Sequence, residues 1–148
     1  MDVEHLILRV VVKTLFAPII LFGLYVQFHG DYGPGGGFQA GVIIAVAFIL
    51  HALVFGLDAT KKAVPETVLK WLMAFGVLLF AGTGVATMLL GGGYLGYTEI
   101  APQSTHHAGQ HYGILIVELG VGIAVAATML MIFYNFVGRE PEIDPEDW

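Results

Sequence analysis

The stretch HGDYGPGGGFQAG, residues 29–41, interrupts a chain that is otherwise strongly apolar. Five glycines and Pro34 lie between residues 29 and 37, with an apolar run on either side. Glycine permits positive φ and proline fixes its own φ at about −65°, so this composition predicts a tight reversal of the chain. We interpret it as a membrane turn, because Phe38 and Gln39 follow the last glycine where a Walker loop requires Lys and Ser or Thr.

A second glycine-rich segment, GGGYLG at residues 91–96, matches the G-x-G-x-x-G spacing of a dinucleotide-binding loop. It follows an apolar run that is typical of a membrane helix, whereas the dinucleotide-binding loop follows a strand of a βαβ unit. The sequence therefore predicts no nucleotide site in either glycine-rich segment.

Apolar residues dominate the composition. The 148 residues are 57% hydrophobic and 12% charged, whereas a soluble domain averages about 25% charged residues. Four apolar runs are each long enough to cross about 30 Å of hydrocarbon as a helix; they cover residues 6–28, 38–57, 67–90 and 112–137. These runs do not alternate apolar and polar residues as β-barrel strands do. We therefore predict an all-α integral membrane protein with four transmembrane helices.

The basic residues predict the orientation of these helices. The two glycine-rich connections, residues 29–37 and 91–111, contain no Lys or Arg, and every basic residue falls on the other side: Arg9, Lys13, Lys61, Lys62, Lys70 and Arg139. By the positive-inside rule, both termini are expected in the cytoplasm and both glycine-rich connections outside. The second connection, DATKKAVPET at residues 58–67, is expected to be a short polar loop, and residues 138–148 an acidic cytoplasmic tail.

Several functions are disfavoured by what the sequence lacks. It contains no cysteine, which excludes disulfides, thiolate zinc sites and iron–sulfur ligation by cysteine. No basic patch indicates nucleic-acid binding. Acidic residues precede the first apolar run and no small-residue cleavage site precedes Pro18, so a removable signal peptide is not expected.

Two motifs resemble those of one family. The stretch at residues 29–41 resembles the H-x-x-P-G-G-G-F-x-G region of the B subunit of Mrp-type (Mnh) cation/proton antiporters, with a longer spacing between His29 and Pro34. The segment YGILIVELGVGIAVAATML, residues 112–130, resembles the family's (F/V)-(D/E)-L-G-V segment, with Glu118 at the acidic position. The likeness covers nearly the whole chain. The same subunit type occurs in archaeal membrane-bound hydrogenases and related sulfur-reducing complexes, and the unfamiliar loop at residues 98–113 favours such a host.

The resemblance implies a single MnhB-like domain over residues 1–148 that acts as a membrane subunit of a multi-subunit Mrp-like module in the prokaryotic plasma membrane. Such a module translocates Na⁺ and H⁺, and this chain is expected to bind no cofactor. The expected partners are other Mrp-like membrane subunits, membrane lipid and, in a hydrogenase host, its peripheral subunits. The chain offers no nucleophile–base pair, so we expect a non-catalytic subunit. The alternative is a structural scaffold without an ion path.

Glu118 is the acid that lies well inside an apolar run. We expect it about six residues, roughly 9 Å, from the outer end of its helix. An ionised carboxylate there is costly, and such residues usually face a partner or a cavity. It is either a proton or Na⁺ relay or a carboxyl that holds two helices together. Thr83 and Thr87 share one helix face and are candidate partners of Glu118, unless they bond only their own backbone.

Other polar residues have competing interpretations. His51 lies inside the second run and Lys13 inside the first, each as a candidate ion-path residue. The alternatives are a packing histidine and a lysine that extends to the headgroups. His107 and His111 stand four apart near His106, which suits a metal only if this segment is helical. We favour a solvated or partner-facing cap and predict no metal site.

Small residues predict a close helix contact. Gly37, Gly41 and Ala45 are spaced four apart, a pattern that lets another helix approach closely. Pro34, Gly35 and Gly36 would form the turn that leads into this row. The alternative interpretation is that backbone amides of the turn, with His29 and Asp31, line an ion path.

Overall fold

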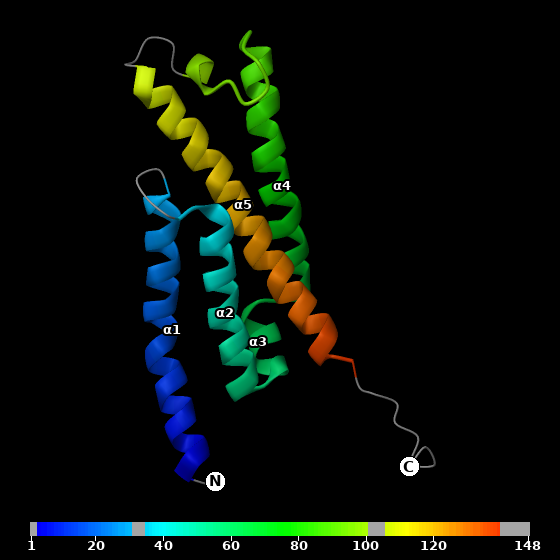
Figure 1. Ribbon diagram of the computed structural model, residues 1–148. Helices are drawn as coiled ribbons and strands as arrows, with labels where there is room; N and C mark the ends of the chain where they lie inside the picture. Colours follow the sequence, from blue (N-terminus) through cyan, green and yellow to red (C-terminus); the bar gives the residue numbers. More distant parts are fainter. Residues whose placement is uncertain (1–2, 31–34, 101–105, 140–148) are drawn as a thin grey trace, which may run out of the picture.

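The computed structural model describes residues 3–30, 35–100 and 106–139, with side chains from residue 6 and, in the last segment, from residue 108. Its described part contains helices and no strand (Figure 1). The elements are α1 (Val3–His29), α2 (Gly37–Phe55), α3 (Leu57–Ala63), α4 (Glu66–Leu89), a 3₁₀ helix η1 (Tyr97–Ile100) and α5 (His106–Val137). Four of these helices, α1, α2, α4 and α5, are long and apolar enough to cross a membrane. The predicted all-α membrane fold is confirmed.

The connection between α2 and α4 differs from its prediction. We expected a polar loop there, and this was wrong, because the seven-residue helix α3 occupies most of it. Gly56, with φ of +95°, ends α2 two residues before the predicted boundary and turns the chain. Asp58 lies in the first turn of α3 and lysines in its last turn, an arrangement that complements the helix dipole.

Helix α5 begins six residues earlier than predicted, at His106 instead of Tyr112. Hydropathy misses its first turns because they are polar. A tertiary contact accompanies them: a Cβ atom at Gly113 would collide with the ring of Tyr97, so η1 lies directly against α5. Glu118 therefore lies twelve residues after the start of α5, roughly 18 Å along its axis. The expected distance of about 9 Å from the outer end of the helix was wrong.

Helix α5 is the central element of the bundle. It packs against α2 on one side and α4 on the other, while α1 packs mainly against α2 (Figure 1). The contact of α4 with α5 is close: a Cβ atom at Gly76 would lie 2.6 Å from the carbonyl oxygen of Gly120. Glycine at such positions is typical of membrane helices, where packing instead of the hydrophobic effect holds helices together.

Both ends of the bundle have a distinct composition. The starts of α1 and α4, all of α3 and the end of α5 lie at one end, which we call the basic end (Figure 1). It carries Arg9, Lys13, Lys61, Lys62, Lys70 and Arg139. The end of α1 and the start of α2 lie at the other end of their hairpin, and α4 and α5 extend beyond them (Figure 1). That the basic end faces the cytoplasm stays a prediction.

The outer surface is strongly apolar. Large hydrophobic side chains are exposed along the spanning helices, among them Trp71 (74%), Leu89 (83%) and Phe136 (78%). Apolar patches of this extent mark a membrane or protein interface. The buried core is small and lies between α4 and α5 near the basic end, built around Leu69, Leu130 and Tyr134. The bundle therefore depends on lipid or on neighbouring subunits to cover its surface.

Candidate functional site

Glu118 lies where α1, α2 and α5 meet. A Cβ atom at Gly30 would lie 2.7 Å from both carboxylate oxygens, and one at Gly36 would lie 3.1 Å from Oε1. A Cβ atom at Gly37 would collide with the backbone carbonyl oxygen of Glu118 itself. Gly36 also has a backbone φ of +127°, a conformation that residues other than glycine rarely adopt. The carboxyl of Glu118 thus rests against backbone at positions that admit only glycine without rearrangement.

The small-residue row of α2 faces α5. A Cβ atom at Gly41 would lie 2.6 Å from the carbonyl oxygen of Gly122 and 2.9 Å from Cβ of Val125. Ala45, one turn further, is buried. The structure thus places Gly37, Gly41 and Ala45 in the interior, with both glycines in close contact with α5.

The turn that leads into this row is described in part. Gly35 and Gly36 follow α1 closely: a Cβ atom at Gly35 would lie 2.9 Å from the carbonyl oxygen of Val26, which accepts a hydrogen bond from Gly36 N at 3.4 Å. Pro34 and Asp31 lie outside the described residues.

Gln27 is a polar residue of this junction that our sequence analysis missed. Its side chain is 3% exposed, and its Nε2 has no hydrogen-bond partner among the residues that the structure describes. A Cβ atom at Gly122 would lie 2.5 Å from Oε1 of Gln27, so the amide lies against the α5 backbone. The available signal was an uncharged amide in an apolar run, three residues before Gly30.

Thr83 and Thr87 are buried in α4 and bond their own helix. Thr83 Oγ1 donates to the Leu79 carbonyl oxygen at 2.7 Å, and Thr87 Oγ1 donates to that of Gly84 at 2.8 Å. Both hydroxyl hydrogens are therefore used within α4, the alternative that the sequence left open. The carboxyl of Glu118 lies on the side of α5 that faces α1 and α2.

His51 and Lys13 belong to a different part of the molecule, near the basic end. His51 Nδ1 lies 2.8 Å from Thr60 Oγ1, and its ring stacks on Phe55 with centroids 4.7 Å apart. Lys13 Nζ lies 5.6 Å from the centroid of the same Phe55 ring. His51 is fourteen residues after Gly37 in α2, roughly 21 Å along the helix. The structure thus does not bring these residues together with Glu118.

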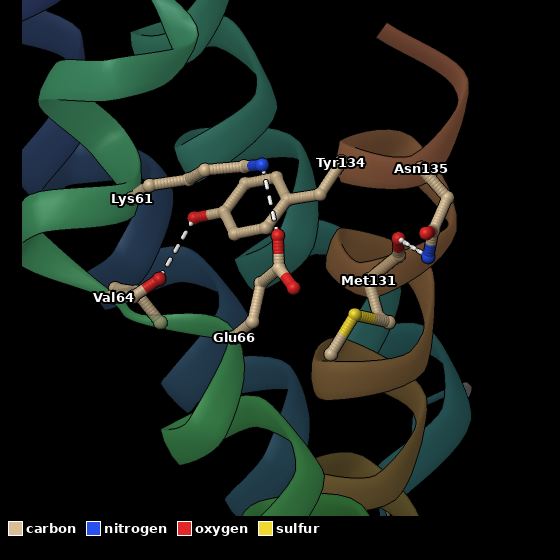
Figure 2. A network of polar contacts seen from close by, with 6 residues as sticks. All are labelled: Lys61, Val64, Glu66, Met131, Tyr134 and Asn135. Atoms are coloured by element: carbon tan, nitrogen blue, oxygen red, sulfur yellow. Dashed lines mark hydrogen bonds and ion pairs between the residues drawn. The ribbon is translucent and has the colours of Figure 1, made fainter. Parts of the chain in front are cut away.

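A second polar network joins α5 to α3 and α4 at the basic end (Figure 2). Tyr134 is 1% exposed, and its hydroxyl donates to the Val64 carbonyl oxygen at 3.1 Å. Lys61 Nζ lies 2.8 Å from Glu66 Oε1 and 5.5 Å from the centroid of the Tyr134 ring. Both charged side chains are substantially exposed, and such exposed pairs contribute little to stability. Tyr134 is therefore the buried member of this network, and its hydroxyl connects α5 to the segment between α3 and α4.

An apolar groove connects the two polar regions. Its volume is about 370 Å³, and it lies between α2 and α4 along one face of α5. Its lining runs from Val64 and Leu130 near the basic end to Leu119, Gly122 and Gln27 beside the Glu118 junction.

The three histidines of the last connection, His106, His107 and His111, lie in helical structure, because α5 begins at His106. The side chains of His106 and His107 lie outside the described part. Among the described residues, no group of three His, Cys, Asp or Glu side chains is placed to hold a metal ion.

The four long apolar helices define a multi-pass membrane protein, and Glu118 is a partly buried carboxyl within the longest of them. A family model described as the domain related to the MnhB subunit of Na⁺/H⁺ antiporters matches residues 7–131, and the chain belongs to this family. The chain is 30% identical over 139 residues to a Staphylococcus epidermidis protein named as antiporter subunit mnhB2, covering 93% of this chain and 98% of the relative. A protein of the same name from Staphylococcus aureus strain Newman has the same identity and coverage.

Proposed function

We propose that this chain is a membrane subunit of a multi-subunit Mrp-type Na⁺/H⁺ antiporter and that Glu118 lies on its ion path. The observation that carries the second part is the position of the carboxyl, which lies against glycine backbone at the junction of three helices. Ionisable groups inside membrane helices are costly, and they commonly mark ion pathways or proton relays.

The glycine-lined junction suits an exchanging carboxyl. Gly30, Gly36 and Gly37 present no side chains to Glu118, so at these three positions Glu118 faces backbone. A carboxyl in such a place alternates between a neutral form that carries a proton and an ionised form that attracts a cation. The family description names a Na⁺/H⁺ antiporter, which supports Na⁺ and H⁺ as the ions that meet the chain at these carboxyl oxygens.

Two hosts follow from the sequence, a standalone antiporter and a hydrogenase-type respiratory complex. The names of the curated relatives support the first. In either host the exposed apolar faces pack against other Mrp-like membrane subunits and lipid. Affinity purification from the native membrane separates the two: antiporter subunits alone support the first, and hydrogenase-like large subunits would replace it with the second.

The variant Glu118→Gln tests the ion-path role in the assembled complex. It keeps the size and hydrogen-bonding capacity of the side chain and removes the charge, so the complex should assemble while Na⁺/H⁺ antiport in vesicles is lost. Glu118→Asp should be milder, since it keeps the carboxyl. Glu99→Gln is the matched control, because Glu99 is an exposed acid in η1. Wild-type antiport by an assembled Glu118→Gln complex would show that the carboxyl is structural and that the chain is a scaffold.

A further inference from the structure

Gln27 has a buried amide that packing alone leaves unexplained. Its Nε2 is without a partner among the described residues, and the side chain is 3% exposed. A buried donor without an acceptor is costly, and a membrane span offers little water to satisfy it. An apolar side chain of similar size would fill the same space at lower cost. The amide at this position therefore points to an acceptor that it meets during the working cycle.

Gln27 and Glu118 lie on facing sides of one contact between α1 and α5. A Cβ atom at Gly122 would lie 2.5 Å from Gln27 Oε1, and a Cβ atom at Gly30 would lie 2.7 Å from both oxygens of Glu118. Gly122 is one turn after Glu118 on α5, and Gly30 directly follows the end of α1, three residues after Gln27. Each polar side chain thus lies against a glycine of the opposite chain segment, and each glycine is three or four residues from the other polar side chain.

The Glu118 carboxyl is the acceptor at this junction that can carry a charge. The nearby backbone carbonyls already accept hydrogen bonds: that of Gly36 from Ala40 N at 3.1 Å, and that of Val26 from Gly36 N at 3.4 Å. A carboxylate offers about four lone-pair sites, so one carboxylate can accept hydrogen bonds from several donors at once. Hydrogen bonds to an ionised acceptor are also stronger than those between neutral groups.

We propose that Gln27 is a positioning residue for Glu118, whose carboxylate accepts a hydrogen bond from the Gln27 amide Nε2 when the carboxyl is ionised. The amide holds the ionised carboxylate at the α1–α5 contact, where the arriving cation or proton meets it. This role in transport rests on the proposed function of Glu118, whereas the contact itself does not.

The test compares Gln27→Met with wild type in the assembled complex in vesicles. Methionine has a similar length and no amide, so it removes the donor at nearly constant volume. The infrared stretching bands of the Glu118 carboxyl are assigned by their loss in Glu118→Gln. In Gln27→Met these bands should shift, and antiport should fall about tenfold, the rate change that corresponds to one hydrogen bond. Gln110→Met is the matched control, because Gln110 is exposed on α5 and should change neither readout.

Unshifted Glu118 bands in an assembled Gln27→Met complex would overturn the proposal. If the bands shift while both Gln27→Met and Glu118→Gln transport at the wild-type rate, the contact is established and the ion-path role of Glu118 fails. If Gln27→Met does not assemble, Gln27→Asn replaces it. Asparagine keeps the amide, but its side chain is one methylene shorter, so the amide lies further from the Glu118 carboxyl. The bands should shift there too, and an unchanged spectrum would again overturn the contact.

Discussion

At the scale of single residues, glycine at positions 30, 36 and 37 is what allows the carboxyl of Glu118 to lie between three helices. Side chains at Gly30 or Gly36 would press on the carboxylate oxygens, and one at Gly37 would collide with the Glu118 backbone. Tyr134 has a comparable structural role at the basic end, where its buried hydroxyl bonds the connection between α3 and α4. Few residues thus hold each polar region in place.

Replacement of Tyr134 by phenylalanine should lower stability while leaving transport intact. The variant removes the donor to the Val64 carbonyl oxygen, a contact of 3.1 Å. Val64 is half-buried, so the loss of this bond should cost about 0.5–1.5 kcal/mol. Thermal unfolding of the purified complex measures it, with Tyr112→Phe as control, because Tyr112 is 55% exposed. Equal unfolding temperatures for both variants would show that the bond contributes nothing.

At the scale of helices, the α2–α5 contact depends on a backbone approach that a side chain would block. Gly41 faces the Gly122 carbonyl oxygen and the Val125 side chain across this contact. Sequence spacing alone predicted that this row would meet another helix, because small residues four apart have few other uses in a membrane helix. Which helix it meets follows only from the structure.

The variant Gly41→Leu should separate α2 from α5 and reduce the amount of assembled complex. A leucine there must fit where a Cβ atom alone would lie 2.6 Å from backbone, and overpacking costs about 1–3 kcal/mol or more. Gly82→Leu is the control on α4, since no described atom lies within 4 Å of a Cβ atom at Gly82. Yields of assembled complex from membranes compare the two. Wild-type yield from Gly41→Leu would disprove the close contact.

Some elements followed from sequence and others did not, for physical reasons. Hydropathy predicts the four long helices because each must span the same apolar layer. It misses α3, which forms after Gly56 ends α2, and the polar first turns of α5, which have η1 against them. It also misses Gln27, because the amide of this residue is buried by a contact between α1 and α5, which hydropathy along the chain does not show.

At the scale of the whole molecule, all basic residues gather at one end of a bundle whose outer surface is apolar. This asymmetry is the physical basis for the proposed orientation, with the basic end in the cytoplasm. The same arrangement places Glu118 well away from the basic end, since it lies nineteen residues before the end of α5.

Labelling of single cysteines tests this orientation, and the chain contains no cysteine of its own to interfere. Lys62→Cys lies in α3 at the basic end. Glu99→Cys lies in η1, which follows α4 at the end of the bundle away from the basic end. Both positions are exposed. An impermeant maleimide added to intact cells should label Glu99→Cys and leave Lys62→Cys unlabelled until the membrane is opened. The reverse pattern would invert the topology.

The central claim is that Glu118 exchanges protons and cations within the membrane. An apolar carbodiimide reacts with protonated carboxyls in membrane interiors, so it probes this property at Glu118 directly. Mass spectrometry of the assembled complex should find Glu118 modified, antiport should fall in proportion to the modified fraction, and Na⁺ should slow the modification. Full antiport by a complex whose Glu118 is completely modified would contradict the account.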